Sequence, residues 1–156
     1  MRDFGRRLGA LAQPGDLLLL TGPLGAGKTT LVQGLGEALG VRGPVTSPTF
    51  VIARVHPSLI GGPALVHVDA YRLGGLAEVD DLDLDLGGSV TVVEWGEGLA
   101  EGLSADRLEI TISFAPGGAS GAVDPGDEPR ILDIRAAGSR WRPIVAQAPT
   151  QSASRA

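Results

Sequence analysis

The stretch TGPLGAGKTT, residues 21–30, contains residue types at the spacing of a phosphate-binding loop. It matches the pattern G-x-x-x-x-G-K-[ST], in which glycines let backbone N–H groups approach an anion closely. Lys28 is the only lysine among 156 residues, and the other basic residues are all arginines. A compact ammonium suits a tight phosphate loop, whereas the wide planar fork of arginine does not. This pattern therefore predicts a phosphate site.

The predicted ligand of this loop is a nucleoside triphosphate with Mg²⁺. Lys28 would contact the β- and γ-phosphates, and the Thr29 hydroxyl would bind the metal ion. The predicted nucleotide-binding residues are Gly22, Gly25, Ala26, Gly27, Lys28, Thr29 and Thr30. The alternative is a glycine-rich turn with a surface lysine, but surface lysines normally occur in numbers and this chain has one.

Two acidic residues each follow an apolar run, Asp69 in LVHVDAYRL and Glu94 in VTVVEWGE. In open α/β sheets ligands bind beyond the carboxyl ends of the strands, and a carboxylate there needs a cation or a donor. We predict that Asp69 holds Mg²⁺ directly or through water, and that Glu94 binds the metal or orients the attacking water. The structural alternatives are a helix N-cap for Asp69 and a salt bridge to a neighbouring arginine for Glu94.

The segment TSPTF, residues 46–50, places three hydroxyls around Pro48. GTPases and related switches use this location for a hydroxyl that senses the γ-phosphate through Mg²⁺. Thr49 is therefore a candidate catalytic residue, as are Lys28 and Glu94. An ordinary Ser-Pro turn is the alternative.

The two histidines carry weaker signals. His67 lies within a predicted strand, where a core histidine is more common than a catalytic acid or base. His56 precedes Pro57 and is interpreted as a loop residue.

The segments on both sides of the loop have the patterns that the motif requires. Residues 17–20 are an unbroken run of leucines after QPGD, which is typical of a parallel strand buried on both faces. After the loop, apolar residues recur on one face of a helix, and Gly40 lies where a C-terminal cap belongs. The apolar face consists of Leu31, Val32, Leu35, Ala38 and Leu39. The N-terminus of this helix would face the bound anion.

The remaining chain predicts an α/β fold with a P-loop NTPase-like, mixed, mainly parallel sheet flanked by helices and an antiparallel edge near the C-terminus. Helices are expected at 1–12 and 76–86, and a weaker one at 96–102. Strands are expected at 50–55, 64–68, 90–93, 107–114 and 130–136, the last two forming the antiparallel edge. We expect a single domain over 1–142, a mobile loop at 115–129 and a disordered tail over 143–156.

Composition limits the classes of function. The formal charge of −5 and the pI near 4.9 argue against direct binding to a nucleic acid backbone, so a nucleic acid partner would be reached through another protein. Cysteine is absent, which excludes disulfides and thiolate metal sites. No apolar run approaches 18 residues and no signal pattern begins the chain, so we expect a cytoplasmic protein that is not in a membrane.

Five segments in this order resemble the TsaE (YjeE) family of small bacterial P-loop ATPases: GPLGAGKTT, TSPTF, HVDAYRL, VVEWGE and DRLEI. The resemblance spans about residues 4–114. It implies a role in forming threonylcarbamoyladenosine (t6A) at adenosine 37 of tRNA, together with the TsaD and TsaB proteins. It also implies phosphate binding by Gly22 to Thr30, Mg²⁺ binding by Thr29 and Asp69, a switch role for Thr49, and an active-site pair of Glu94 and Trp95.

Two hypotheses follow from the sequence. The first is a slow, partner-stimulated ATPase that serves tRNA modification; slowness is expected because no arginine is clearly placed as an arginine finger. The second is a nucleotide-gated assembly module, in which ATP binding docks the partner and hydrolysis is incidental.

Overall fold

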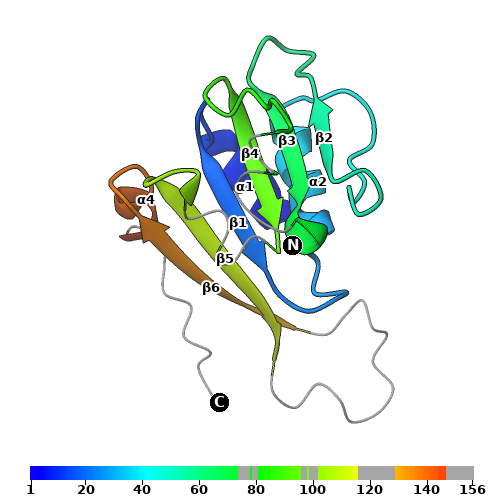
Figure 1. Ribbon diagram of the computed structural model, residues 1–156. Coiled ribbons are helices and arrows are strands. Elements are labelled where there is room, and N and C mark those ends of the chain that lie inside the picture. Colours follow the sequence, from blue (N-terminus) through cyan, green and yellow to red (C-terminus); the bar gives the residue numbers. More distant parts are fainter. Residues whose placement is uncertain (74–77, 79–80, 96–97, 99–101, 116–128, 147–156) are drawn as a thin grey trace.

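The structure, a computed structural model, describes residues 1–73, 78, 81–95, 98, 102–115 and 129–146. These residues form one six-stranded sheet in the order β2-β3-β4-β1-β5-β6 (Figure 1). The strands are β1 (Leu17–Thr21), β2 (Ala53–His56), β3 (Ala64–Asp69), β4 (Ser89–Glu94), β5 (Arg107–Phe114) and β6 (Arg130–Ala137).

The centre of the sheet is parallel, and both edges are antiparallel. Strand β1 lies between β4 and β5 and runs parallel to both, and β3 runs parallel to β4. The predicted antiparallel edge of β5 and β6 is confirmed. A second antiparallel edge, between β2 and β3, was not predicted. The mixed, mainly parallel α/β architecture is therefore as the sequence indicated.

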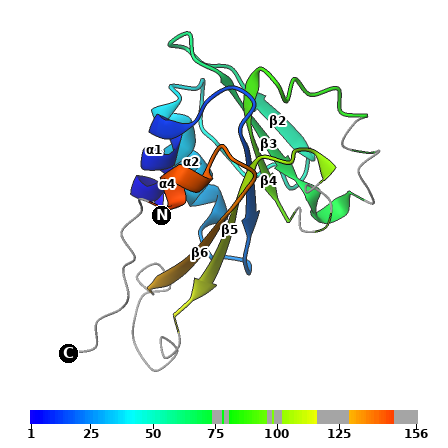
Figure 2. The same ribbon diagram turned by 90° about the vertical axis from the view of Figure 1, so that its left-hand side faces the viewer.

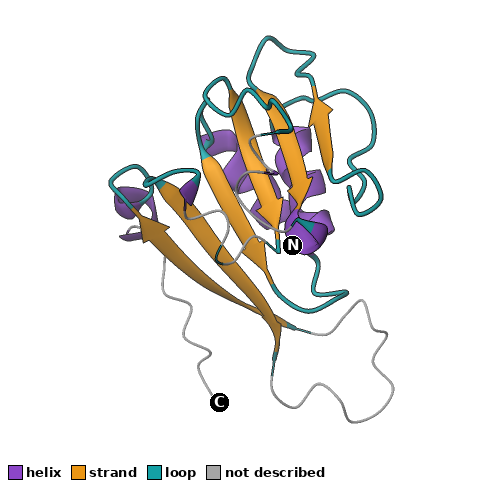
Figure 3. Cartoon of the chain, in the orientation of Figure 1, coloured by secondary structure: helices purple, strands orange, loops and turns teal. Residues whose placement is uncertain are grey.

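Three helices lie on one side of this sheet: α1 (Arg2–Leu11), α2 (Lys28–Ala38) and α4 (Arg142–Ala146) (Figures 2 and 3). Helices α1 and α2 cross closely because glycines stand at the crossing. A Cβ at Gly5 would come within 2.0 Å of the Leu31 carbonyl oxygen, and one at Gly34 within 2.0 Å of that of Arg2. Among the described residues, no helix is long and apolar enough to cross a membrane.

Both faces of the central strands are buried, as the leucine run predicted. Leu18 and Leu20 pack toward the helices, in a cluster that includes Leu31 and Leu35 of α2. Leu17 and Leu19 belong to a second cluster on the opposite face, which includes Val66, Val68 and Val93. Because both faces of β1 are buried, the position of this strand in the sheet is fixed, and the phosphate-loop segment begins where the strand ends.

Helix α2 follows the loop and ends before Gly40, as the sequence indicated. It starts at Lys28, after Gly27, and its last residue is Ala38. Gly40 has a φ of 61°, the left-handed conformation that closes many helix C-termini. The short 3₁₀ helix η1 (Ala70–Arg72) follows β3 directly.

One sequence-based boundary was wrong. The strand predicted from residue 50 begins at Ala53, because the N–H groups of Val51 and Ile52 both donate to the Pro48 carbonyl and form a turn. Phe50 is consequently 90% exposed.

The first residues of the predicted tail, 143–146, belong to α4. Residues 147–156 lie outside the described residues. The loop predicted at 115–129 and the helices predicted at 76–86 and 96–102 also lie mostly outside them.

Candidate functional site

The glycines of the segment 21–30 adopt conformations that other residues avoid. Gly22, Gly25 and Gly27 have φ values of 148°, 76° and 103°. At Gly22 a Cβ would also come within 2.4 Å of the Ile112 carbonyl oxygen on β5. The backbone can therefore follow this path only with glycine at these positions.

Helix α2 presents an uncapped N-terminus at the end of this loop. Its first intrahelical bond runs from Leu31 N–H to Gly27 O, so the N–H groups of Lys28, Thr29 and Thr30 precede it. No side chain of the described residues caps this end. Free N–H groups and the positive end of the helix dipole together favour an anion.

Lys28 lies buried beneath this loop. Its Nζ donates to the carbonyl oxygens of Gly22 at 2.7 Å and Pro23 at 3.1 Å. The ammonium also stands 4.0 Å from the centre of the Trp95 ring. Burial lowers the pKa of Lys28, and the negative charges of Glu94 and Asp69 oppose that shift. Both carboxylates thus act electrostatically on the ammonium.

Asp69 and Glu94 are side by side at the carboxyl ends of neighbouring parallel strands. They are register partners in the β3–β4 ladder, and Glu94 is also opposite Leu20 on β1. Both side chains are buried. Glu94 Oε1 lies 3.4 Å from the Thr29 hydroxyl on α2. The strand order therefore brings the two predicted acids together beside the loop.

The structural alternatives proposed for the two acids have different outcomes. Asp69 Oδ1 accepts a hydrogen bond from Tyr71 N–H at 3.0 Å, so Asp69 does cap η1. Glu94 has no arginine partner among the described residues; its closest partner is His67, whose Nε2 lies 2.7 Å from Glu94 Oε1. His67 is fully buried.

The remaining predicted residues occupy varied positions. Ala26 is buried in the core below the loop, and Thr30 is exposed in the first turn of α2. The Thr49 hydroxyl is exposed and lies 2.6 Å from that of Ser47. Among the described residues, the hydrogen bond of the Thr49 side chain is with Ser47 and with none of the other predicted site residues. His56 was wrongly taken as a loop residue: it is the last residue of β2 and is buried.

Three contacts in the site were missed from the sequence. His67 and Asp69 are two residues apart on one strand and therefore share a face of the sheet, but the His67–Glu94 contact also requires β3 to lie next to β4. Trp95 has a φ of 61°, and its ring contacts that of Tyr71 edge to face as well as Lys28. This left-handed backbone at a bulky residue left no sequence signal.

The oxygen donors near the loop fit Mg²⁺ chemistry. Thr29 offers a hydroxyl, and Asp69 and Glu94 offer carboxylates, all of them hard oxygen ligands. No group of three His, Cys, Asp or Glu side chains in the described part of the chain could hold a metal ion by itself.

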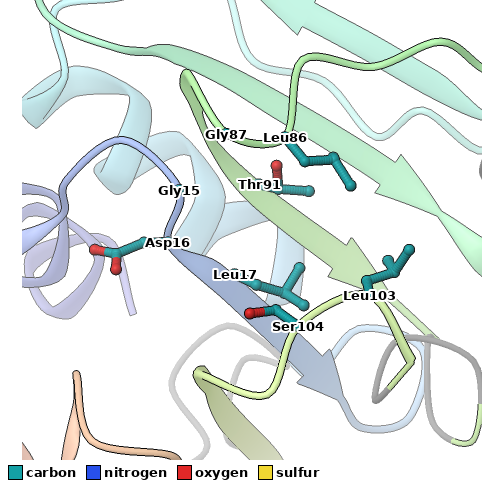
Figure 4. A pocket seen from close by; sticks show the side chains of 8 residues that line it. All are labelled: Gly15, Asp16, Leu17, Leu86, Gly87, Thr91, Leu103 and Ser104. Atoms are coloured by element: carbon teal, nitrogen blue, oxygen red, sulfur yellow. The ribbon is translucent and has the colours of Figure 1, made fainter.

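A separate cavity of about 170 Å³ lies at the opposite end of β1 (Figure 4). Leu17 and Thr91 line it from the sheet, and Leu86 and Leu103 from the connecting segments. The Asp16 carboxylate points away from it in this view. This cavity includes none of the predicted site residues.

The sequence and fold match known proteins. A family model described as "Threonylcarbamoyl adenosine biosynthesis protein TsaE" matches residues 1–118. A protein of Streptomyces coelicolor named "tRNA threonylcarbamoyladenosine biosynthesis protein TsaE" is 62% identical, over 90% of this chain and 93% of its own length. A Bacillus subtilis protein of the same name is 40% identical, over 85% of this chain and 77% of its own.

A solved structure has the same fold. The crystal structure of YdiB from Bacillus subtilis superposes with a TM-score of 0.68 and 34% sequence identity, covering 93% of this chain and 84% of the other. The family match over most of the chain, the close relatives and the shared architecture lead to one conclusion: this chain belongs to the TsaE family, whose members are named for threonylcarbamoyladenosine biosynthesis in tRNA.

Proposed function

We propose that this protein binds and hydrolyses ATP with Mg²⁺ in support of t6A formation at adenosine 37 of tRNA. The observation that carries the proposal is the meeting of Lys28, Asp69 and Glu94 at a glycine-rich loop. Buried groups of opposite charge surround the loop, and the N-terminus of α2 adjoins it. An ATP triphosphate supplies the negative charge, and Mg²⁺ the positive charge, that this arrangement can bind.

Each residue has a distinct part in this proposal. The backbone of Gly22 to Thr30 cradles the phosphates. Lys28 Nζ exchanges the Gly22 and Pro23 carbonyls for phosphate oxygens, which are stronger acceptors because they are charged. Thr29 and Asp69 hold the metal ion, Thr49 senses the γ-phosphate, and Glu94 orients the attacking water or shares the metal.

Bound Mg²⁺ would supply charge neutralisation on the phosphate oxygens. The chain itself holds the phosphates in place and excludes water beneath the loop, where Ala26, Leu31 and Val32 are fully buried. A low-dielectric floor strengthens the interaction of the ammonium with the phosphates.

We further propose that the protein acts with TsaD and TsaB in the cytoplasm, and reaches tRNA only through them. The acidic charge of the chain supports indirect contact, since a tRNA backbone repels it. Hydrolysis is slow without partners, because no described arginine contacts Lys28, Glu94 or Thr29.

Calorimetric titration tests nucleotide binding. The wild type should bind ATP with Mg²⁺, and Lys28→Ala should lose about 10- to 100-fold in affinity, as expected when a charge-assisted hydrogen bond is removed. Arg7→Ala, which removes one positive charge from the exposed side of α1, is the matched control and should bind as the wild type does. A wild type that releases no heat with ATP, or an unaffected Lys28→Ala, contradicts the proposal.

The assembly-module hypothesis remains a second candidate, because Lys28 and the loop could bind ATP without turnover. Glu94→Ala separates the two. If hydrolysis is required, cells carrying Glu94→Ala lose t6A although the protein still binds ATP. If hydrolysis is incidental, t6A persists.

A pull-down on immobilised TsaD and TsaB with ATP, ADP or no nucleotide tests whether docking follows the nucleotide. Unequal recovery supports docking that depends on the bound nucleotide. Equal recovery in all three conditions contradicts it.

A further inference from the structure

One buried polar side chain beside the proposed site has no part in the function proposed above. His67 is in the middle of β3, at 0% exposure, with its Nε2 2.7 Å from Glu94 Oε1. The Glu94 side chain is itself 4% exposed. The contact is therefore shielded from water on both sides.

The surroundings of His67 would suit an apolar residue better. On the same face of the sheet lie Leu65, two residues before it on β3, and its register partner Val92 on β4, and both are fully buried. The other ring nitrogen, Nδ1, is buried without a hydrogen-bond partner in the part of the chain that the structure describes. An imidazole here therefore costs desolvation that only one contact offsets, and that contact is to Glu94.

The contact has a defined direction. A carboxylate oxygen accepts hydrogen bonds, so Nε2 is the donor and Glu94 Oε1 the acceptor. A neutral ring protonated on Nε2 leaves Nδ1 as a bare acceptor, which avoids burying an unpaired N–H. The geometry thus selects one tautomer of His67.

This donor fixes one end of the Glu94 carboxylate. Oε1 receives His67 Nε2 at 2.7 Å and lies 3.4 Å from the Thr29 hydroxyl, whereas Oε2 takes no hydrogen bond from the described residues. A carboxylate held by one oxygen keeps a fixed orientation and leaves the second oxygen available to a ligand.

We propose that His67 is a positioning residue, which donates from Nε2 to Glu94 Oε1 and so holds Oε2 ready for the attacking water or the metal ion. This inference rests on the proposed ATP hydrolysis. His67 itself touches neither nucleotide nor water in it; it acts only through Glu94.

Three substitutions of His67 separate donation from mere packing. Gln can place an amide N–H where Nε2 stands, Asn places its amide nearer to Nδ1, and Leu fills space without a donor. We expect His67→Leu and His67→Asn to lose about 10- to 100-fold in kcat, as outer-sphere partners of active-site ligands do. His67→Gln should stay within about threefold of the wild type in kcat, and KM for ATP should change little in all three.

The matched control is His56→Gln, which alters the other buried histidine; that residue faces Leu65 in the β2–β3 ladder and makes no contact with Glu94. It should leave kcat unchanged. Thermal unfolding of every variant shows which of them fold. The inference is overturned if the folded Gln, Asn and Leu variants of His67 all have the same kcat, whether that kcat is close to the wild-type value or far below it. The position of the donor would then not matter.

A second measurement needs neither nucleotide nor a variant. Long-range ¹H–¹⁵N spectra of the wild-type imidazoles report which ring nitrogen of His67 carries the proton. A proton on Nε2 supports the inference, and a neutral ring protonated on Nδ1 overturns it. If the wild type neither binds nor hydrolyses ATP, the proposed function fails, and this spectrum still decides whether His67 donates to Glu94.

Discussion

Asp16 and Glu94 are buried carboxylates at opposite ends of the central strand β1, and they are partnered in opposite ways. Asp16 precedes β1 and receives hydrogen bonds on both oxygens: Arg140 Nε at 3.0 Å and Nη2 at 2.9 Å, and Gln13 N–H at 2.8 Å. Glu94, opposite Leu20 near the other end of that strand, has partners among the described residues on Oε1 alone.

The difference separates a structural carboxylate from a candidate functional one. The Asp16–Arg140 pair joins the start of the sheet to a residue 124 positions later in the chain, and Arg140 Nη2 also donates to the Leu11 carbonyl at the end of α1. Removing one partner of such a hydrogen-bonded pair leaves an uncompensated buried charge, so the fold depends on both side chains. An acid with a free oxygen contributes little to stability and can bind a ligand.

The largest expected effect is on turnover. Glu94→Gln should lower kcat for ATP by about 10²- to 10⁴-fold, the usual contribution of a positioned base. Its thermal midpoint should stay close to that of the wild type, because the amide can still accept from His67. Steady-state kinetics and differential scanning calorimetry test both halves. A Glu94→Gln protein that unfolds much earlier would make this acid structural, like Asp16.

Arg140→Met should have the converse effect. It leaves the Asp16 charge buried without its cation, so the free energy of unfolding should fall by about 3 kcal/mol, near the low end for a broken buried pair because Arg140 is partly exposed. That corresponds to about 6 to 12 °C in Tm. Urea unfolding provides the measurement.

ATP affinity and kcat of Arg140→Met at 15 °C should match the wild type. In the double variant Asp16→Asn with Arg140→Met, the loss in free energy of unfolding should be smaller than the sum of the losses in the two single variants. Additive effects would show that the two side chains are not coupled.

The two tryptophans report on the two ends separately. Trp95 lies against the Lys28 ammonium, and Trp141 is buried with Arg140 4.5 Å from the centre of its ring. If Lys28 moves to a phosphate, ATP should change the emission of Trp95, measured in Trp141→Phe. The emission of Trp141, measured in Trp95→Phe, should stay constant. Equal responses would show that the two ends are not independent.

The smallest expected effect is the acid dependence of stability at the Arg140 end. The N–H groups of Arg140 and Ser139 hold the pKa of Asp106 below its ordinary value. A lowered folded-state pKa contributes stability above the unfolded-state pKa, near 4, and this stability is lost as the pH falls through the folded-state value. Tm should therefore fall less steeply below pH 4 in Asp106→Asn, as measured by thermal scans from pH 6 to pH 2.5. Parallel curves would contradict a role for Asp106.

The sequence predicted the local parts of this site well. The leucine run of β1, the loop and the start of α2 at Lys28 are contiguous, so short-range patterns contain the needed information. Asp69 and Glu94 are also at strand ends as predicted, because each follows a buried apolar run.

Nonlocal pairing accounts for what was missed. The contact between His67 and Glu94 depends on β3 lying next to β4, which no local pattern reveals. The contact between Asp16 and Arg140 spans nearly the whole chain. Turn chemistry misled the strand prediction at Phe50, where apolar residues continue through a turn closed by the Pro48 carbonyl.

The first and second glycines of the loop are retained for different reasons. A side chain at Gly22 would press on the backbone of β5, whereas a Cβ at Gly25 would meet nothing within 4 Å, and only its φ of 76° disfavours one. A relative that had abandoned nucleotides altogether would still need glycine at 22 to keep its sheet intact. For anyone surveying such relatives, position 25 is thus the better indicator of whether the loop still serves a ligand.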